Sequence, residues 1–298
     1  MAKSVSVCIP AHNEEKYIGN LLRTLQSVPV DEVLVCLSGC TDRTGEIART
    51  YGADLIESEI GKPAAWNALM ETAKGERRVF YDGDVSVSVA GVEALVRGLD
   101  VPGTVFSVTH VRSYASMNGM AGLIGPFLFR HLEDGRLCGT GYAFEADTLV
   151  DRMRSAGYAR MPMDVLAEDY WLECLAPDAI TLMPGAYVDH PVGGIDDFLR
   201  VHARVQAGRQ QMMLEYPDLV LKNAHANKGF CQRCVDVYLQ SAGLCDVLHR
   251  AGVYAARRAV LRLYGGRFDE LRREMDMRCE NAAHLLACAG RGTHKDAI

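Results

Sequence analysis

The stretch Ser4-Val5-Ser6-Val7-Cys8-Ile9-Pro10-Ala11-His12-Asn13-Glu14-Glu15 passes from a run rich in β-forming residues into a polar loop. The next residues carry apolar side chains at the spacing of one buried helix face, at Ile18, Leu21, Leu22 and Leu25. The pattern predicts a strand over residues 4–9 and a helix over residues 14–27. This unit is the expected start of a layered α/β domain.

The same alternation continues over the first hundred residues. Three more strands and two more helices are expected, at residues 32–37, 53–57 and 78–81 and at residues 44–51 and 64–73. Strands separated by crossover helices favour a mostly parallel sheet, which binds its ligands at the carboxyl ends of the strands. We therefore expect the chemistry of this domain just after Ile9, Leu37 and Tyr81.

The composition narrows the class of protein. The chain has 298 residues, of which 49% are hydrophobic, and a net charge of −6. Disorder as the main state is excluded, and a general nucleic-acid binder is disfavoured because no overall basic field would attract phosphates. No apolar run is long enough for a membrane span. The ten cysteines lie scattered among apolar neighbours, which indicates reduced thiols and a cytoplasmic location.

An acidic pair follows the fourth expected strand in Val79-Phe80-Tyr81-Asp82-Gly83-Asp84-Val85. In extended backbone, residues i and i+2 point to the same side, so the carboxylates of Asp82 and Asp84 can face one ion. Oxygen ligands suit Mg²⁺ or Mn²⁺, and such an ion would neutralise a diphosphate leaving group. A surface turn is the alternative, because Asp-Gly-Asp is common in turns.

Four segments in order resemble the family 2 glycosyltransferases with the GT-A fold. They are Ile9-Pro10-Ala11-His12-Asn13-Glu14-Glu15, Ser38-Gly39-Cys40-Thr41-Asp42-Arg43-Thr44, Gly61-Lys62-Pro63-Ala64-Ala65-Trp66-Asn67 and Asp82-Gly83-Asp84. The resemblance implies a GT-A domain, an α/β fold with a Rossmann-like, mostly parallel sheet, over residues 1–210. Residues 211–298 are expected to form a C-terminal helical extension.

The resemblance also implies a donor site for a nucleotide-diphospho-sugar, UDP- or GDP-linked. The residues expected there are Pro10, His12, Asn13, Glu14, Ser38, Lys62, Asp82, Gly83 and Arg204. Each has an alternative: Glu14 is also favoured at a helix start by the helix dipole, and Arg204 could lie on a solvated helix face. His12 stands where the family usually has an aromatic residue, and Ser38 follows Leu37 where many members have an aspartate. The nucleobase therefore stays open.

The acceptor side is expected around Met163-Asp164-Val165-Leu166-Ala167-Glu168-Asp169-Tyr170-Trp171-Leu172, which resembles the family's Glu-Asp motif. The resemblance implies that Asp169 is the general base of an inverting transfer and that Glu168 orients the loop. The alternative is a helix start with favourable early charges. His190 is the leading candidate for a third metal ligand and His202 the second; a structural histidine is the alternative for both.

The function expected from these motifs is a metal-dependent transfer of a sugar to an acceptor hydroxyl. The acceptor is expected to be a small molecule or lipid-linked, and the apolar residues 120–130 could cover a lipid, form a lid or pack in the core. The C-terminal helices could form a homodimer. A retaining GT-A transferase, a sugar-nucleotide nucleotidyltransferase and a non-catalytic sugar-nucleotide-binding scaffold are the alternatives.

Overall fold

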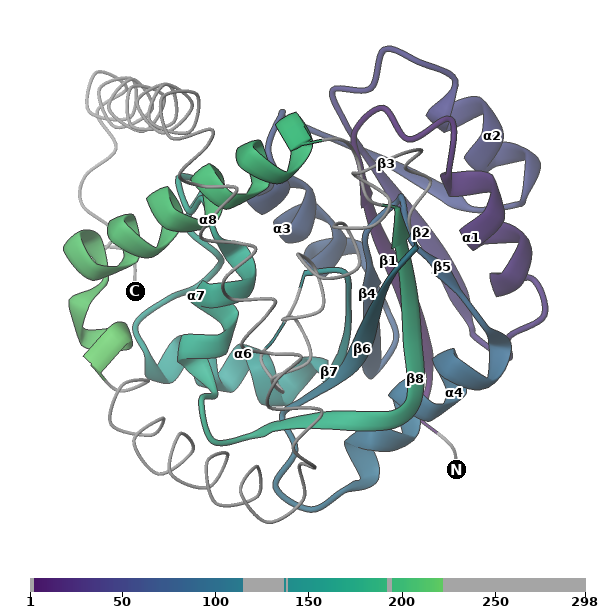
Figure 1. Ribbon diagram of the computed structural model, residues 1–298. Coiled ribbons are helices and arrows are strands. Elements are labelled where there is room, and N and C mark those ends of the chain that lie inside the picture. Colours follow the sequence, from purple (N-terminus) through teal and green to yellow (C-terminus); the bar gives the residue numbers. More distant parts are fainter. Residues whose placement is uncertain (1–2, 115–136, 138, 192–194, 222–298) are drawn as a thin grey trace, which may run out of the picture.

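A single eight-stranded sheet forms the centre of the computed structural model, which describes residues 3–114, 137, 139–191 and 195–221 (Figure 1). The strands are β1 (Val5–Ala11), β2 (Glu32–Ser38), β3 (Asp54–Ser58), β4 (Arg77–Tyr81), β5 (Ser86–Val87), β6 (Phe106–Tyr114), β7 (Gly141–Glu145) and β8 (Ile180–Pro191). The helices are α1 (Ile18–Leu25), α2 (Thr44–Thr50), α3 (Lys62–Thr72), α4 (Val89–Arg97), α6 (Ala146–Ser155), α7 (Glu168–Leu175) and α8 (Ile195–Glu215), with a 3₁₀ turn at Gly98–Asp100.

The sheet has a parallel half and a mixed half, in the order β3-β2-β1-β4-β7-β6-β8-β5. Strands β3, β2, β1 and β4 are parallel, as the strand and helix alternation predicts. Strand β7 then runs antiparallel to β4 and to β6, while β8 is parallel to β6 and antiparallel to β5. The carboxyl ends of β1, β2 and β4 consequently share one edge of the sheet.

Each face of the sheet is covered by helices, so the protein has two apolar cores. Alternate residues of a strand point to opposite faces. In β1, Cys8 belongs to the core beneath α3, α6 and α7, whereas Val7 and Ile9 belong to the core beneath α1, α2 and α4. All three side chains are fully buried. Both faces of β1 are therefore apolar, as expected for a strand buried on two sides.

An aromatic cluster ties α3 to the junction of β4 and β7. Trp66 donates a hydrogen bond from Nε1 to the Tyr142 hydroxyl at 3.0 Å, and the Tyr142 ring stacks on Phe80 at a centroid distance of 5.5 Å. Phe144 also stacks on Phe80, at 5.7 Å. These contacts fix the first turn of α3 beside the end of β4, where the candidate site lies.

The mixed half differs from the sequence expectation. Strand β8 is long because the chain passes through Gly185 at φ +85° and pairs again with β6. The register between β6 and β8 shifts between Val108 and His110. Helix α4 was not expected; Ser88 caps it by accepting a hydrogen bond from the Gly91 amide at 3.1 Å.

Several sequence expectations lie outside the described residues. These are the apolar segment 120–130, the C-terminal helices beyond residue 221 and the homodimer that they were expected to form. Helix α8 continues past residue 210, and Met212 is buried against the domain, as is Tyr216 just after the helix. No helix in the described ranges has the length and apolarity needed to cross a lipid bilayer.

Candidate active site

Two loops at the carboxyl edge of the sheet are held together by their own polar side chains. The loop after β1 turns at Asn13, whose φ of +58° is left-handed and whose Oδ1 accepts a hydrogen bond from the Thr41 amide at 2.8 Å. The Glu14 amide donates to Thr44 Oγ1 at 2.7 Å, and the Glu15 amide donates to Asp42 Oδ2 at 3.0 Å. Backbone groups of the first loop are thus satisfied by side chains of the second.

Ser38, at the end of β2, holds a third loop in place. Its hydroxyl donates to the Glu59 carbonyl at 3.1 Å and accepts from the Gly61 amide at 2.9 Å. The Ser38 carbonyl in turn accepts a hydrogen bond from His12 Nδ1 at 2.6 Å. The His12 side chain is exposed, and Pro10 lies in β1 opposite Cys36. Nucleotide contacts by Pro10, His12 and Ser38 stay a prediction.

The aspartate pair lies where β4 ends, and each carboxylate has a cationic neighbour. Asp82 Oδ1 is 2.8 Å from Lys62 Nζ, and Asp84 Oδ2 is 3.2 Å from His190 Nε2. Glu14 packs over the glycine between them: a Cβ on Gly83 would be 2.9 Å from Glu14 Cγ. Only glycine leaves room for this approach of the first loop to the pair.

The donor atoms at the pair fit a hard divalent cation, which prefers carboxylate oxygen. Asp84 Oδ1 is buried and, among the described atoms, has no hydrogen-bond partner. A buried carboxylate oxygen without a partner is costly, and a cation would satisfy it. In the described ranges no three His, Cys, Asp or Glu side chains are grouped around a common point as metal ligands would be. His190 lies beside Asp84, as expected, and its role as a third ligand stays a prediction; the His202 side chain is outside the described part.

Lys62 connects the aspartate pair to the start of α7. Its Nζ is 2.7 Å from Glu168 Oε1 in addition to its contact with Asp82. Arg204, on α8, lies 3.9 Å from the other oxygen of Glu168, whose side chain is only 4% exposed. Gly139 leaves space for this contact, since a Cβ there would be 2.9 Å from Lys62 Nζ and 3.1 Å from Glu168 Oε1.

Asp169 follows Glu168 in the first turn of α7 and lies on the same side of the site. Its Cβ is 3.9 Å from the position that a Cβ on Gly139 would take. Its Oδ1 accepts a hydrogen bond from the Tyr170 amide at 2.8 Å. The sequence reasoning thus placed Asp82, Asp84 and Asp169 at one edge of the sheet, and the structure brings them to that edge.

Burial and neighbouring charges shift the pKa values of the carboxyl groups in the site. Burial and, to a smaller extent, the carboxylates of Asp84 and Asp82 together raise the pKa of Glu14 to about 8. Burial also raises the pKa of Asp169, with the Glu168 carboxylate beside it. For Glu168, burial alone would raise the pKa, but Lys62 and Arg204 hold it below the usual value.

The pKa values of the two basic groups, Lys62 and His190, are raised by their acidic neighbours although burial lowers them. Burial alone would lower the pKa of Lys62, but Asp82 and Glu168 raise it well above its usual value. Burial likewise disfavours protonated His190, yet the hydrogen bond to Asp84 raises the pKa of His190. The site therefore holds Lys62 charged and keeps Glu168 ionised beside it.

The sequence reasoning missed the residues that brace the site. Asp42, Thr44 and Cys40 belong to the second loop, and Cys40 Sγ donates to the Ala11 carbonyl at 3.3 Å. An aspartate two residues before a helix start favours an Asx turn, which could have identified Asp42 and Thr44, because Asp42 accepts from the Thr44 amide at 3.0 Å. The contact of Lys62 with Glu168 has no signal in the sequence.

Residues 6–149 match the family described as Glycosyl transferase family 2. The chain carries a family 2 glycosyltransferase domain. Its relatives include 4,4'-diaponeurosporenoate glycosyltransferases of Staphylococcus aureus, which are 32% identical over 169 residues, or 50% of this chain and 44% of theirs. The chain thus spans less than half the length of these curated relatives.

Solved structures are similar to this chain. S. aureus TarS is 18% identical with a TM-score of 0.50, over 93% of this chain and 54% of that chain. Glucosyl-3-phosphoglycerate synthase of Mycobacterium tuberculosis, in complex with Mn²⁺, UDP and glucosyl-3-phosphoglycerate, is 22% identical with a TM-score of 0.49, over 71% of this chain and 79% of that chain. The expected GT-A fold is confirmed by the family match and the sheet.

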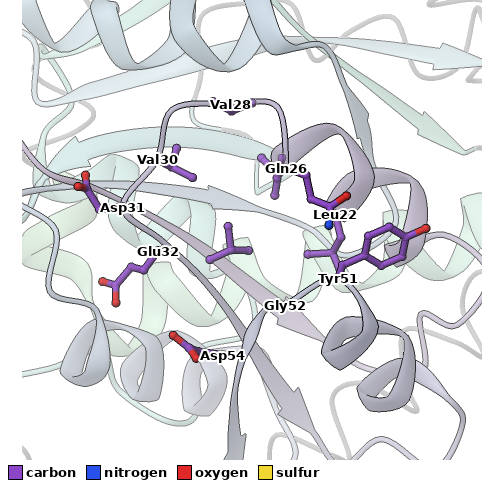
Figure 2. A pocket seen from close by; sticks show the side chains of 11 residues that line it. Leu22, Gln26, Val28, Val30, Asp31, Glu32, Tyr51, Gly52 and Asp54 are labelled. Atoms are coloured by element: carbon purple, nitrogen blue, oxygen red, sulfur yellow. The ribbon is translucent and has the colours of Figure 1, made fainter.

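A surface hollow of about 300 Å³ lies at the opposite edge of the sheet, by the amino ends of β2 and β3 (Figure 2). The end of α1 contributes Leu22 and Leu25 to its wall, and Asp31 and Asp54 stand at the starts of the two strands. Glu32, which also lines it, accepts hydrogen bonds from Ser6 Oγ and from the Lys74 amide. The hollow is separate from the candidate active site, which lies at the carboxyl ends of the strands.

Proposed function

We propose that the protein transfers a sugar from a nucleotide-diphospho-sugar to an acceptor hydroxyl, with inversion at the anomeric carbon and with the help of a divalent cation. One observation carries this proposal: the aspartate pair at the end of β4 and the Glu168-Asp169 pair at the start of α7 meet through Lys62. A donor-side acidic pair and an acceptor-side carboxylate at one edge are the two halves that this reaction needs.

In the proposed reaction, the acceptor oxygen bonds to the anomeric carbon as the bond from that carbon to the diphosphate oxygen breaks. Asp169 takes the proton of the acceptor hydroxyl, and Glu168 orients the first turn of α7. The raised pKa of Asp169 supports this role, because a stronger base accepts a proton more readily at neutral pH. The nucleoside diphosphate leaves on the side of the loops that contain His12 and Asn13.

Asp82 and Asp84 would hold Mg²⁺ or Mn²⁺, with His190 as the proposed third ligand. Such an ion, when bound, supplies Lewis-acid stabilisation of the negative charge that develops on the leaving diphosphate. The unpartnered Oδ1 of Asp84 supports this assignment. Arg204 and Gly83 are proposed on the donor side as well, Arg204 by its charge and Gly83 by the close approach that a glycine allows.

The function is tested with a panel of UDP- and GDP-sugars and Mn²⁺, measured by release of nucleoside diphosphate. A panel of small-molecule and lipid-linked acceptors is added, and the configuration of the product separates inversion from retention. A nucleotidyltransferase would instead release pyrophosphate from a nucleoside triphosphate and a sugar phosphate. Binding of a donor without turnover on any acceptor, in the presence of Mn²⁺, would favour the scaffold alternative.

The metal assignment is tested separately by calorimetry. In the variant Asp84→Ala, donor binding should lose its dependence on Mn²⁺. Binding that remains fully dependent on Mn²⁺ in this variant would contradict the proposed role of the pair.

A further inference from the structure

Lys62 connects the proposed donor side of the described site to the proposed acceptor side. Its ammonium contacts one carboxylate on each side, Asp82 and Glu168. Its Nζ is 2.8 Å from Asp82 Oδ1 and 2.7 Å from Glu168 Oε1. Both contacts are of the short length typical of charge-assisted hydrogen bonds. The Lys62 ammonium thus lies between two carboxylates of the protein, and its contact with the nucleotide stays a prediction.

The position of the ammonium is fixed rather than incidental. The Lys62 side chain is 28% exposed, and Glu168 is almost fully buried. A side chain at position 139 would enter the space of both groups, and that position is a glycine. The base of α3 is anchored by the hydrogen bond from Trp66 to Tyr142, one turn from Lys62.

Asp82 would be a ligand of the divalent cation in the proposed function, and Lys62 already neutralises its carboxylate. Two cations at hydrogen-bonding distance from one carboxylate repel each other strongly in a partly buried site. Lys62 also has a second carboxylate within reach, so it need not become exposed when it leaves Asp82. The three carboxylates of Asp82, Asp84 and Glu168 make this region negative enough to hold a cation with or without Lys62.

We propose that Lys62 is an internal competitor of the divalent cation: it pairs with Asp82 until the cation binds and then pairs with Glu168 alone. This inference rests on the proposed function, since it takes Asp82 as a metal ligand. Lys62 is then a positioning residue, because it gives up Asp82 and keeps Glu168, which neighbours the candidate base Asp169, when the cation binds.

The test measures the binding of Mn²⁺ alone to the whole chain. Binding is measured by calorimetry and by the paramagnetic resonance signal of free Mn²⁺. Lys62→Met should bind Mn²⁺ at least about tenfold more tightly than the wild type, because the competing charge is gone. Lys62→Arg keeps the charge and should stay within about threefold of the wild type. Lys74→Met removes an exposed lysine just beyond the other end of α3 and should leave the affinity unchanged.

The double variant Lys62→Met with Asp84→Ala shows whether any gain belongs to this site, because the gain should disappear. An unchanged or weaker Mn²⁺ affinity in Lys62→Met overturns the proposal, provided that the variant keeps the circular dichroism spectrum of the wild type. If Asp84→Ala loses Mn²⁺ binding but Lys62→Met binds Mn²⁺ with wild-type affinity, the proposed competition by Lys62 fails while the metal site at Asp84 stands. If the wild type binds no Mn²⁺ at all, the metal part of the proposed function fails with it.

A second measurement uses the wild type and covers the case in which Lys62→Met does not fold. The ¹⁵Nζ resonance of Lys62, assigned through Lys62→Arg, should shift on addition of Mg²⁺, because the hydrogen bond to Asp82 is lost. A resonance that stays unchanged at saturating Mg²⁺ would contradict displacement of Lys62.

Discussion

Replacement of Glu14 by glutamine should stabilise the protein at alkaline pH and leave its stability nearly unchanged at acid pH. The carboxyl of Glu14 faces the aspartate pair, and its pKa rises from 4.5 to about 8 on folding. Below pH 4.5 the group is protonated in both the folded and the unfolded state. Between pH 4.5 and 8 only the unfolded state is ionised, so wild-type stability falls as the pH rises through this window.

The size of the effect follows from the shift. The full shift from 4.5 to about 8 would correspond to about 5 kcal/mol. Because the Glu14 side chain is only half-buried, solvent screening reduces this by roughly half, to ~2 kcal/mol above pH 8. Glu14→Gln lacks this penalty, since the amide carries no charge.

The assay is urea unfolding of wild type and Glu14→Gln at pH 5 and at pH 8.5, with a chelator present. The difference in the free energy of unfolding should grow by ~2 kcal/mol between the two conditions. The control Glu15→Gln makes the same change at the next residue, whose carboxylate accepts a hydrogen bond from the Arg43 amide at 3.2 Å. A difference for Glu14→Gln that is the same at both pH values would refute the reasoning.

Three further substitutions test other parts of the structure. Asp169→Asn should keep donor affinity and lower transfer by about 10² to 10⁴, measured as nucleoside diphosphate release; unchanged turnover would remove Asp169 as the base. Gly75→Ala should lower the free energy of unfolding by about 3 kcal/mol, because its Cβ would be 2.5 Å from the Ser6 backbone nitrogen, and a loss below about 1 kcal/mol in urea unfolding would contradict this. Ser88→Ala should lower the free energy of unfolding by about 1 kcal/mol, because it removes the acceptor for the Gly91 amide, and Ser88→Asp should keep most of this stability. Equal stabilities of Ser88→Ala and the wild type in urea unfolding would contradict the cap.

The parallel half of the sheet was predictable because its inner strands are buried on both faces. Runs such as residues 33–37 are apolar along their whole length, and this run is followed by a turn and a helix. The pattern therefore contains both the strand and its crossover. The strand ends differ by one or two residues: β1, for example, continues through Pro10 to Ala11, because this backbone still pairs with β2, whereas α1 begins four residues after the expected start.

The mixed half was less predictable because its elements depend on partners distant in the sequence. Strand β5 has only two residues and exists through the pairing of Ser86 with Asp189 and of Val87 with Val188. No local pattern specifies such a strand. Helix α4, by contrast, has the local signal of a capping serine at residue 88 followed by apolar residues on one face, among them Val92 and Leu95.

Some features of the candidate site are also predictable from the sequence, and others depend on the three-dimensional fold. The shared side of Asp82 and Asp84 follows from the two-residue period of extended backbone, and the sequence alone predicts it. The shift in the pKa of Glu14 needs the sheet order, because β1 and β4 are neighbours only in three dimensions. The contact between Lys62 and Glu168 needs the placement of α7 as well, which no spacing in the sequence specifies.

The bracing of the first two loops has a consequence for protein engineering. Amides of the first loop are satisfied by Asp42 and Thr44 of the second, and a side chain of the first, Asn13, accepts from the second in return. Transplanting either loop alone from another transferase would leave amide donors without acceptors on both sides of the junction. The two loops therefore form one exchangeable unit, and chimeras designed to alter donor choice should replace residues 12–15 and 41–44 together.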